Sequence, residues 1–318
     1  MASSGDYVFS ASRNALINGA NRLLGNNREH GAMSADAMVD ASEMLNMMMS
    51  AWQAEGIAMW KKTEVTLFMQ KAVASYSIGP SGDNATSTPY DTELAADADS
   101  GDSTITVDDD DDITDGDYIG IELDTGLFQW TTVNGTPAAN VVTLAAALTG
   151  DTSENNFVVN YTTKCQRPME IIEARLRNSS DVDNILEIVS NVEYRQLSDK
   201  ASTGTPNIMY YDPQLTNGVM YFWQPTNDVE NRAVFTAKYP IEIFSAFDDT
   251  ADFPQEWFLA LKYNLAVLLI PEFMRENKLS VTQINLLRSQ AEDFKEKAMS
   301  FDATYASAQF VPDTGRGR

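Results

Sequence analysis

The chain has little of what metal-dependent and hydrolytic enzymes need. Its 318 residues include one cysteine, Cys165, and one histidine, His30. A single cysteine excludes an internal disulfide framework and a cysteine-based zinc site, and a single histidine excludes a histidine-rich metal site. A Ser–His–Asp triad would have to use His30, and no nucleophile motif accompanies it. We therefore interpret His30 as an exposed loop residue and Cys165 as an inert, partly buried thiol.

Basic residues are also scarce. The chain has 22 Lys and Arg against 46 Asp and Glu, a net charge of −24. A protein that grips duplex DNA, or that binds an anionic membrane, needs a basic surface. Long apolar runs are missing too, because Lys262 and Asn264 interrupt the most apolar segment and Pro271 ends it. We expect no signal peptide, because the first residues lack a basic region followed by an apolar run.

Catalytic and ligand-binding motifs are absent from the sequence, which contains no P-loop, dinucleotide fingerprint, HExxH or GxSxG. The acidic run 108–112 lacks the alternating ligands and central glycine of a calcium loop, so we interpret it as a solvated loop. Asp115-Gly116-Asp117 and Asp124-Thr125-Gly126 fit hairpin turns, where Asp and Gly are favoured for backbone reasons. We predict that the chain is not an enzyme and uses no cofactor or metal.

The most apolar segment, Pro254 to Phe273, predicts a helix with two apolar stripes. A second helix begins at Ser280, where Ser280 and Gln283 fit a capping box. Its apolar residues recur at alternating steps of three and four. Core packing is the simpler interpretation of both helices, and a subunit interface is the sharper one. On the sharper interpretation we expect inter-subunit helix packing by Trp257, Leu261, Leu287, Phe294 and Phe301.

Residues 10–62 also indicate helices. Ser34 is a suitable N-cap, and Met38, Ala41, Leu45, Met48 and Trp52 then form a stripe. The methionines crowded into residues 44–49 fit core packing better than an adaptable binding surface.

From Thr63 the apolar period changes to two, which is typical of strands. Residues 84–100 are small, polar and acidic and indicate a linker or flexible loop. Five short strand candidates separated by turn residues follow in 101–164, and we expect them to form an inserted small β-barrel or sandwich. Three aromatic-rich strands are expected at 207–211, 219–223 and 233–243. Their aromatic residues, Tyr210 to Tyr239, fit a core better than a stacking platform for bases or sugars.

These patterns predict an α+β fold. A helical bundle from the N- and C-terminal helices accompanies a β-rich region with the inserted module. The expected parts are 1–62 and 254–306 for the helical domain, 63–100 for strands and linker, 101–164 for the insert, 165–253 for the rest of the β region, and 307–318 for an extended tail.

The order of segments resembles the head-to-tail adaptors of short-tailed bacteriophages, also described as packaged-DNA stabilisation, head-completion or tail accessory proteins. The matching segments are Leu23-Leu24-Gly25, LNMMMSAWQAEGIAMW (45–60), YSIGPSGD (76–83), GDYIGIELDTGLFQWTTVNG (116–135), RPMEIIEARLRN (167–178) and FPQEWFLALKYNLAVLLIPEF (253–273). They cover most of the chain, and no single one has the specificity of a catalytic motif.

The resemblance implies a virion protein in the neck between portal and tail, assembled in the cytoplasm of the bacterial host. It implies a ring of about twelve copies under the portal. The ring would stabilise packaged DNA, extend the channel through which genomic DNA passes and form a platform for tail or nozzle proteins. It also implies a portal-binding tail, with Phe310, Val311, Arg316 and Arg318 as contacts.

Two other functions stay open at this point. The β insert could recognise a host glycan or receptor while the helices anchor it. A cell-wall hydrolase is a third possibility, which the missing acid–base residues disfavour.

Overall fold

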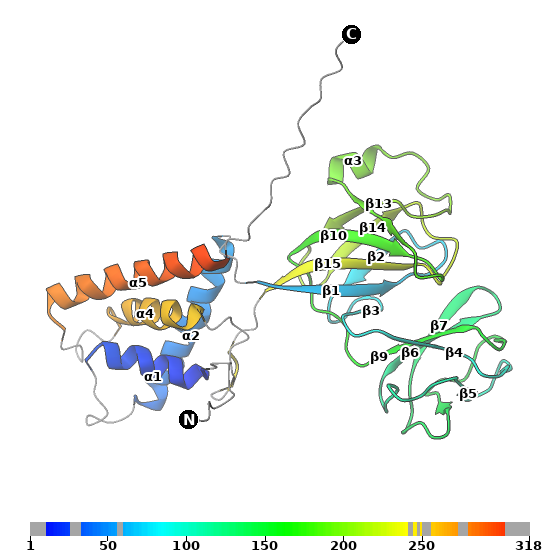
Figure 1. Cartoon of the computed structure of the whole chain (residues 1–318), viewed down its shortest axis with the longest axis horizontal. Helices are drawn as coiled ribbons and strands as arrows, with labels where there is room; N and C mark the ends of the chain where they lie inside the picture. The colour runs from blue at the N-terminus through cyan, green and yellow to red at the C-terminus, as the bar shows by residue number, and fades with distance from the viewer. Residues whose placement is uncertain are drawn as a thin grey trace, which may run out of the picture. The chain divides into compact units, whose positions relative to one another are not determined.

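The described strands lie in one continuous stretch of sequence, and the described long helices lie on either side of that stretch. The computed structural model describes residues 11–25, 33–55, 60–240, 244–246, 249, 256–272 and 279–302. The chain divides into a helical unit, residues 1–60 and 241–318, and a β unit, residues 61–240 (Figure 1). This is the predicted α+β fold. No helix among the described residues is long and apolar enough to cross a bilayer.

The helical unit contains α1 (Arg13–Leu23), α2 (Ala35–Ala54), α4 (Trp257–Leu269) and α5 (Val281–Asp302). Both predicted caps are confirmed. Ser34 Oγ accepts a hydrogen bond from the Ala37 amide at 3.2 Å. At the start of α5 the Ser280 amide donates to Gln283 Oε1 at 2.9 Å, and the Gln283 amide donates to Ser280 Oγ at 3.3 Å. These bonds satisfy amides that have no partner inside their helix.

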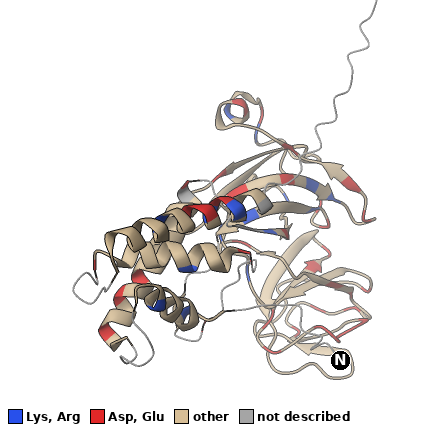
Figure 2. Ribbon diagram, turned by 60° about the vertical axis from the view of Figure 1, so that its left-hand side comes forward, with Lys and Arg blue, Asp and Glu red and all other residues tan. Residues whose placement is uncertain are grey.

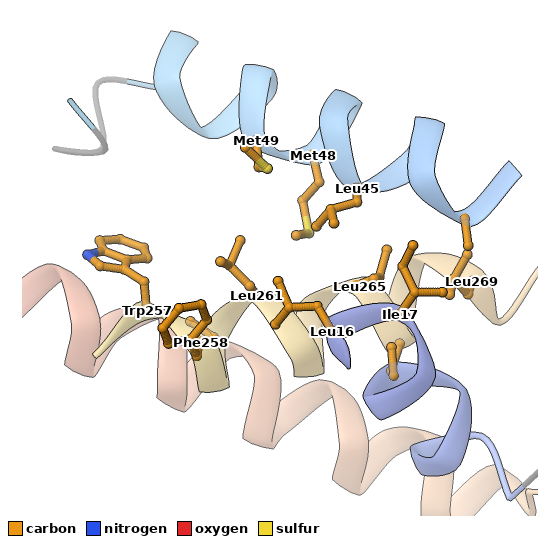
Figure 3. Packing of buried hydrophobic residues seen from close by; sticks show 14 of the residues in the cluster. Leu16, Ile17, Leu45, Met48, Met49, Trp257, Phe258, Leu261, Leu265 and Leu269 are labelled. Atoms are coloured by element: carbon orange, nitrogen blue, oxygen red, sulfur yellow. The ribbon is translucent and has the colours of Figure 1, made fainter. Parts of the chain in front are cut away.

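The core of the helical unit surrounds α4, which contacts α1, α2 and α5. Leu45, Met48 and Met49 of α2 point toward α4 (Figure 3). On α4, Trp257 and Leu261 are completely or almost completely buried. Because Met48 and Met49 are buried, the core interpretation of the methionine cluster is confirmed for these two, whereas the Met47 side chain is 62% exposed.

The body of the β unit consists of two sheets with one shared core. The five-stranded sheet has the order β11-β10-β15-β1-β3, and the four-stranded sheet has the order β12-β13-β14-β2. Their elements are β1 (Trp60–Phe68), β2 (Ser75–Ile78), β3 (Ala85–Thr86), β10 (Glu170–Arg177), β11 (Asp183–Ile185), β12 (Glu187–Ile188), α3 (Asn191–Gln196), β13 (Ile208–Asp212), β14 (Gly218–Trp223) and β15 (Arg232–Pro240). Side chains of both sheets, such as Leu67, Phe222 and Phe235, are fully buried in this core. Since β1 begins at Trp60, the helical part ends before the predicted residue 62.

The inserted module contains all five predicted strands and one that was not predicted. The order β4-β9-β6-β7 unites β4 (Tyr90–Glu93), β6 (Tyr118–Leu123), β7 (Leu127–Thr132) and β9 (Phe157–Tyr161), and β5 (Thr104–Thr106) pairs with β8 (Val141–Thr143). Residues of both sheets, including Ile105, Ile121, Val142 and Val158, share one core, and the described strands form no closed barrel. The module is therefore a small sandwich.

The prediction that residues 84–100 form a linker or flexible loop is wrong. This segment contains β3 and β4, and β4 pairs with β9 along its whole length, from Tyr90 opposite Asn160 to Glu93 opposite Phe157. Every side chain of β4 is at least partly exposed, so its residues lack the apolar alternation that usually indicates a strand.

The insert is fixed to the body of the β unit by aromatic and polar contacts. The rings of Phe68 and Tyr161 stack at 6.2 Å, and the Tyr161 hydroxyl donates to Asn84 Oδ1 at 2.6 Å. The side chain of Gln70 bonds both the amide and the carbonyl of Phe128, each at 3.4 Å. Because these bonds are directional, the insert has a defined orientation on the body.

Candidate interaction surfaces

A groove lies between α1 and α4 on the surface of the helical unit. Its volume is about 560 Å³. Ala11, Ala15 and Gly19 recur every four residues and line one side, while Phe258 and Leu259 line the other. Small residues at these three positions keep the groove open, because larger side chains at this spacing would fill it. The Leu259 side chain is 50% exposed at its edge.

Two cations border this groove. Arg22 and Lys262 lie on its lining together with one anion, Glu256. The Lys262 stem crosses α1 at Gly19, where an added Cβ would lie 3.1 Å from Lys262 Cε. A glycine inside a helix lowers helix stability by about 1 kcal/mol relative to alanine, and here it leaves room for the lysine. Two cations and one anion at the groove contrast with the chain as a whole, which has 46 acidic and 22 basic residues. Figure 2 shows how the charged residues are distributed over the elements.

The outward face of α2 has the opposite character. Asp36, Asp40, Glu43 and Met47 are exposed at steps of four, three and four residues, and Val39 beside them is 58% exposed. The sequence of α2 contains no lysine or arginine. This face is therefore acidic with two apolar side chains, and it lies on the side of α2 opposite to the buried Leu45 and Met48.

Three of the five residues predicted to pack between subunits instead lie in the core of a single chain. Trp257 is 1% exposed, Leu261 is fully buried and Leu287 is 6% exposed. They have almost no surface to offer a second chain, so their predicted role is corrected. Phe294 is partly buried, and its ring lies 4.8 Å from that of Tyr263 within the same unit. The side chain of Phe301 and the predicted portal contacts Phe310, Val311, Arg316 and Arg318 lie outside the described part of the chain.

The carboxylates of the acidic loop 108–112 accept hydrogen bonds from backbone amides inside and outside the loop. The carboxylates of Asp109, Asp110 and Asp111 lie within 4.8 Å of one another and could hold a cation. Asp110 Oδ2, however, accepts from the Asn140 amide at 3.0 Å, and Asp109 Oδ1 accepts from the Asp111 amide at 3.0 Å. Burial, together with a hydrogen bond to Asp109, raises the pKa of the nearby Tyr90 hydroxyl to about 12. The arrangement serves the loop conformation and does not by itself define a metal site.

The turn aspartates also have backbone roles, as predicted. Asp117 accepts from the amide of Thr114 at 2.8 Å, and Asp124 accepts from the amide of Ser153 at 3.0 Å. Gly126, in the β6–β7 turn, has a φ of 70°, which glycine adopts without steric strain.

The aromatic strands divide between core and surface. Phe222 and Phe235 are fully buried, which confirms the core interpretation for these residues. Tyr210 and Tyr221 are only partly buried and stack on each other at 5.7 Å with an interplanar angle of 14°. The ring of Tyr194 from α3 lies 5.5 Å from that of Tyr221 and covers the pair from one side. The Tyr210–Tyr221 stack thus has a third ring, Tyr194 of α3, beside it.

The remaining nucleophile candidate is shielded. Cys165 is buried, and burial raises the pKa of its thiol to about 11. A thiol is nucleophilic only as the thiolate, so Cys165 is inert at neutral pH. His30 lies outside the described residues.

The sequence predictions missed the groove residues Arg22, Leu259 and Lys262. The repeat of small residues at positions 11, 15 and 19 was the signal that could have revealed the groove. No protein-family model matches this chain, and a search of curated proteins finds no similar sequence.

Proposed function

We propose that this chain is a non-enzymatic subunit of a phage virion that forms a head-to-tail adaptor ring under the portal. The observation that carries the proposal is the construction of the helical unit. This unit buries the apolar faces of its own helices. It also presents a cationic apolar groove and an acidic helix face on different sides. Two unlike surfaces on one subunit are what repeated contact in a ring requires. The ordered segments that resemble short-tailed phage adaptors support the same function.

The net charge suits a channel wall. Each chain carries −24, and about twelve copies in a ring would repel DNA phosphates. Genomic DNA would then pass through the lumen without specific binding. A ring whose lumen-facing residues were neutral or basic would contradict this electrostatic role.

The partners follow from the position of such a ring. The portal lies on one side, contacted by the segment 307–318 with Phe310, Val311, Arg316 and Arg318. Tail or nozzle proteins lie on the other. The corresponding location is the neck of the virion, after assembly in the cytoplasm of the bacterial host.

Native mass spectrometry of the full chain, alone and with a portal ring, tests the proposal. A chain that becomes a ring of about twelve copies on the portal supports the adaptor. A chain that ignores the portal contradicts it and favours the alternative, in which the β insert recognises a host glycan or receptor. Deletion of Ala308–Arg318 should weaken portal docking and leave the thermal unfolding transition unchanged. Normal docking by the truncated chain would show that the tail assignment is wrong.

A further inference from the structure

Two surfaces of the helical unit have opposite charge character. The outward face of α2 carries the carboxylates of Asp36, Asp40 and Glu43, and it includes the exposed Val39 and Met47. The α1–α4 groove offers an apolar lining with two cations, Arg22 and Lys262, and one anion, Glu256.

We infer that the outward face of α2 on one copy docks in the α1–α4 groove of the next copy. This inference rests on the proposed ring and identifies the contact that would build it. Val39 and Met47 enter the groove beside Phe258 and Leu259. The carboxylates of α2 then face Arg22 and Lys262. Removal of apolar surface from water supplies affinity, and the charges set the register and exclude other partners.

The small residues of α1 make this docking sterically feasible. The distance between two packed helices is about 8–10 Å and depends on the side chains at the contact. Ala15 is exposed and carries only a methyl group, and Gly19 lets the Lys262 stem lie close against α1, so a third helix can approach the groove closely. Met47 is long and unbranched, and such a side chain adapts to an irregular apolar pocket.

The charges explain why the occupant is a second copy. Chains with a net charge of −24 repel one another, so association needs a local contact between opposite charges. Arg22 and Lys262 provide the cations, and α2 provides three carboxylates without a basic residue. The two surfaces are different patches of the same chain, so the contact is heterologous. Heterologous contacts close into a ring when the rotation per subunit allows it.

A charge exchange tests the contact. The double variant Arg22→Glu/Lys262→Glu replaces the two cations of the groove by anions. The double variant Asp40→Lys/Glu43→Lys replaces two carboxylates of the α2 face by cations. We expect each double variant to weaken ring assembly on the portal at least tenfold, measured by native mass spectrometry across a concentration series. A chain that carries all four changes should regain assembly, because every contact then joins reversed partners and the net charge returns to −24.

Matched controls separate the contact from net charge. Arg288→Glu/Lys297→Glu and Glu292→Lys/Glu296→Lys make the same charge changes at exposed positions of α5. We expect less than a twofold change in assembly for each. Ala15→Leu adds a further test, because it fills the groove at an exposed helical position and should reduce assembly while the circular dichroism spectrum stays unchanged.

A cysteine pair reports the contact directly. Met47→Cys with Leu259→Cys, in the Cys165→Ser background, should yield a ladder of disulfide-linked oligomers under mild oxidation. If assembly is normal in both charge-reversed variants and no ladder forms, the inference is wrong while the adaptor function stands. If the unaltered chain forms no ring on the portal, the proposed function itself fails.

Discussion

The helical unit has one apolar core, whereas the β unit has separate cores in its body and its insert and a join between them. Apolar packing around α4 determines the helical unit, in which Leu45, Leu261 and Leu265 are fully buried. In the β unit, directional contacts such as the Gln70–Phe128 and Tyr161–Asn84 hydrogen bonds join the insert to the body. Apolar packing constrains the buried faces of the helices and leaves their outer faces free to vary. Directional hydrogen bonds instead fix the orientation of the insert on the body. The difference predicts that a cavity near α4 destabilises the helical unit, whereas changes at the join destabilise the β unit.

A cavity in the helical core should have the largest effect, and it should destabilise the helical unit alone. Leu261 is fully buried on α4, so Leu261→Ala should destabilise the helical unit by about 2–5 kcal/mol. Urea unfolding followed by helical circular dichroism measures the loss. Leu286→Ala is the control, because Leu286 is 58% exposed on α5 and its truncation should change stability by less than about 0.5 kcal/mol.

Cys165 reports whether the β unit responds to that cavity. Its thiol is buried and has a pKa of about 11, so thiol reagents at pH 8 should react only when the β unit opens. We expect the labelling rate to be the same in Leu261→Ala as in the unaltered chain. Faster labelling would show that the two units unfold together and would remove the contrast between them.

The second prediction concerns the join between insert and body. A Cβ at Gly120 would lie 2.8–2.9 Å from three atoms of the Trp130 ring, which contacts Phe68 at 5.6 Å. Gly120→Ala should therefore displace Trp130 and destabilise the β unit by about 1–3 kcal/mol in urea unfolding. Adding Trp130→Phe removes the crowding atoms, so the double variant should be more stable than the sum of the two single changes predicts. Simple additivity would contradict the steric explanation.

The third prediction concerns the buried Arg232 guanidinium at this join, and its expected effect is smaller. The Arg232 side chain is 9% exposed and pairs with Asp181 at 3.0 Å and Asp91 at 3.4 Å, which are 75% and 49% exposed. Asp91→Ala/Asp181→Ala leaves a buried guanidinium without these partners and should destabilise the chain by about 1–2 kcal/mol. Arg232→Met leaves two solvated carboxylates, so it should be the milder change in thermal unfolding. If Arg232→Met were the more destabilising change, the contact between the Arg232 guanidinium and the Phe157 ring, 5.1 Å away, would contribute more to stability than the ion pairs do.

Local patterns predicted the elements of both units well. The caps at Ser34 and Ser280 and the five strands of the insert were all visible in the sequence, because capping bonds, turn residues and alternation act over a few positions. The strand β4 was missed because its sequence contains none of these local signals. Its polar residues become a strand only through pairing with β9, which lies far along the chain.

The candidate surfaces were harder to predict than the elements. The two apolar stripes of α4 and the heptad-like spacing of α5 indicated buried faces, but periodicity does not reveal whether the covering residues belong to the same chain. Trp257, Leu261 and Leu287 are covered by their own unit. The groove depends on the approach of α1 to α4 and on the missing side chain at Gly19, and such a feature exists only in the folded chain.

The smallest predicted effect lies at the sheet edge, where a polar contact is mostly solvated. Asp183 of β11 accepts from Arg177 Nε at 2.8 Å and Nη2 at 3.0 Å. The Arg177 hydrogen bonds lower the pKa of the Asp183 carboxyl below its usual value. Its side chain is 36% exposed, and solvent screening limits the contribution of such a pair to less than about 1 kcal/mol.

The pH dependence of this contribution has a definite sign. Because the folded pKa of Asp183 is lowered, the stabilisation is complete above the unfolded pKa of about 3.9 and disappears as pH falls through the folded value. Asp183→Asn should therefore reduce the free energy of unfolding at pH 7, and the difference from the unaltered chain should shrink below about pH 4. Urea titrations across this range measure it, with Glu187→Gln on β12, an edge strand of the four-stranded sheet, as the control. A difference that stayed constant with pH would mean that Asp183 acts through strand packing and not through its charge.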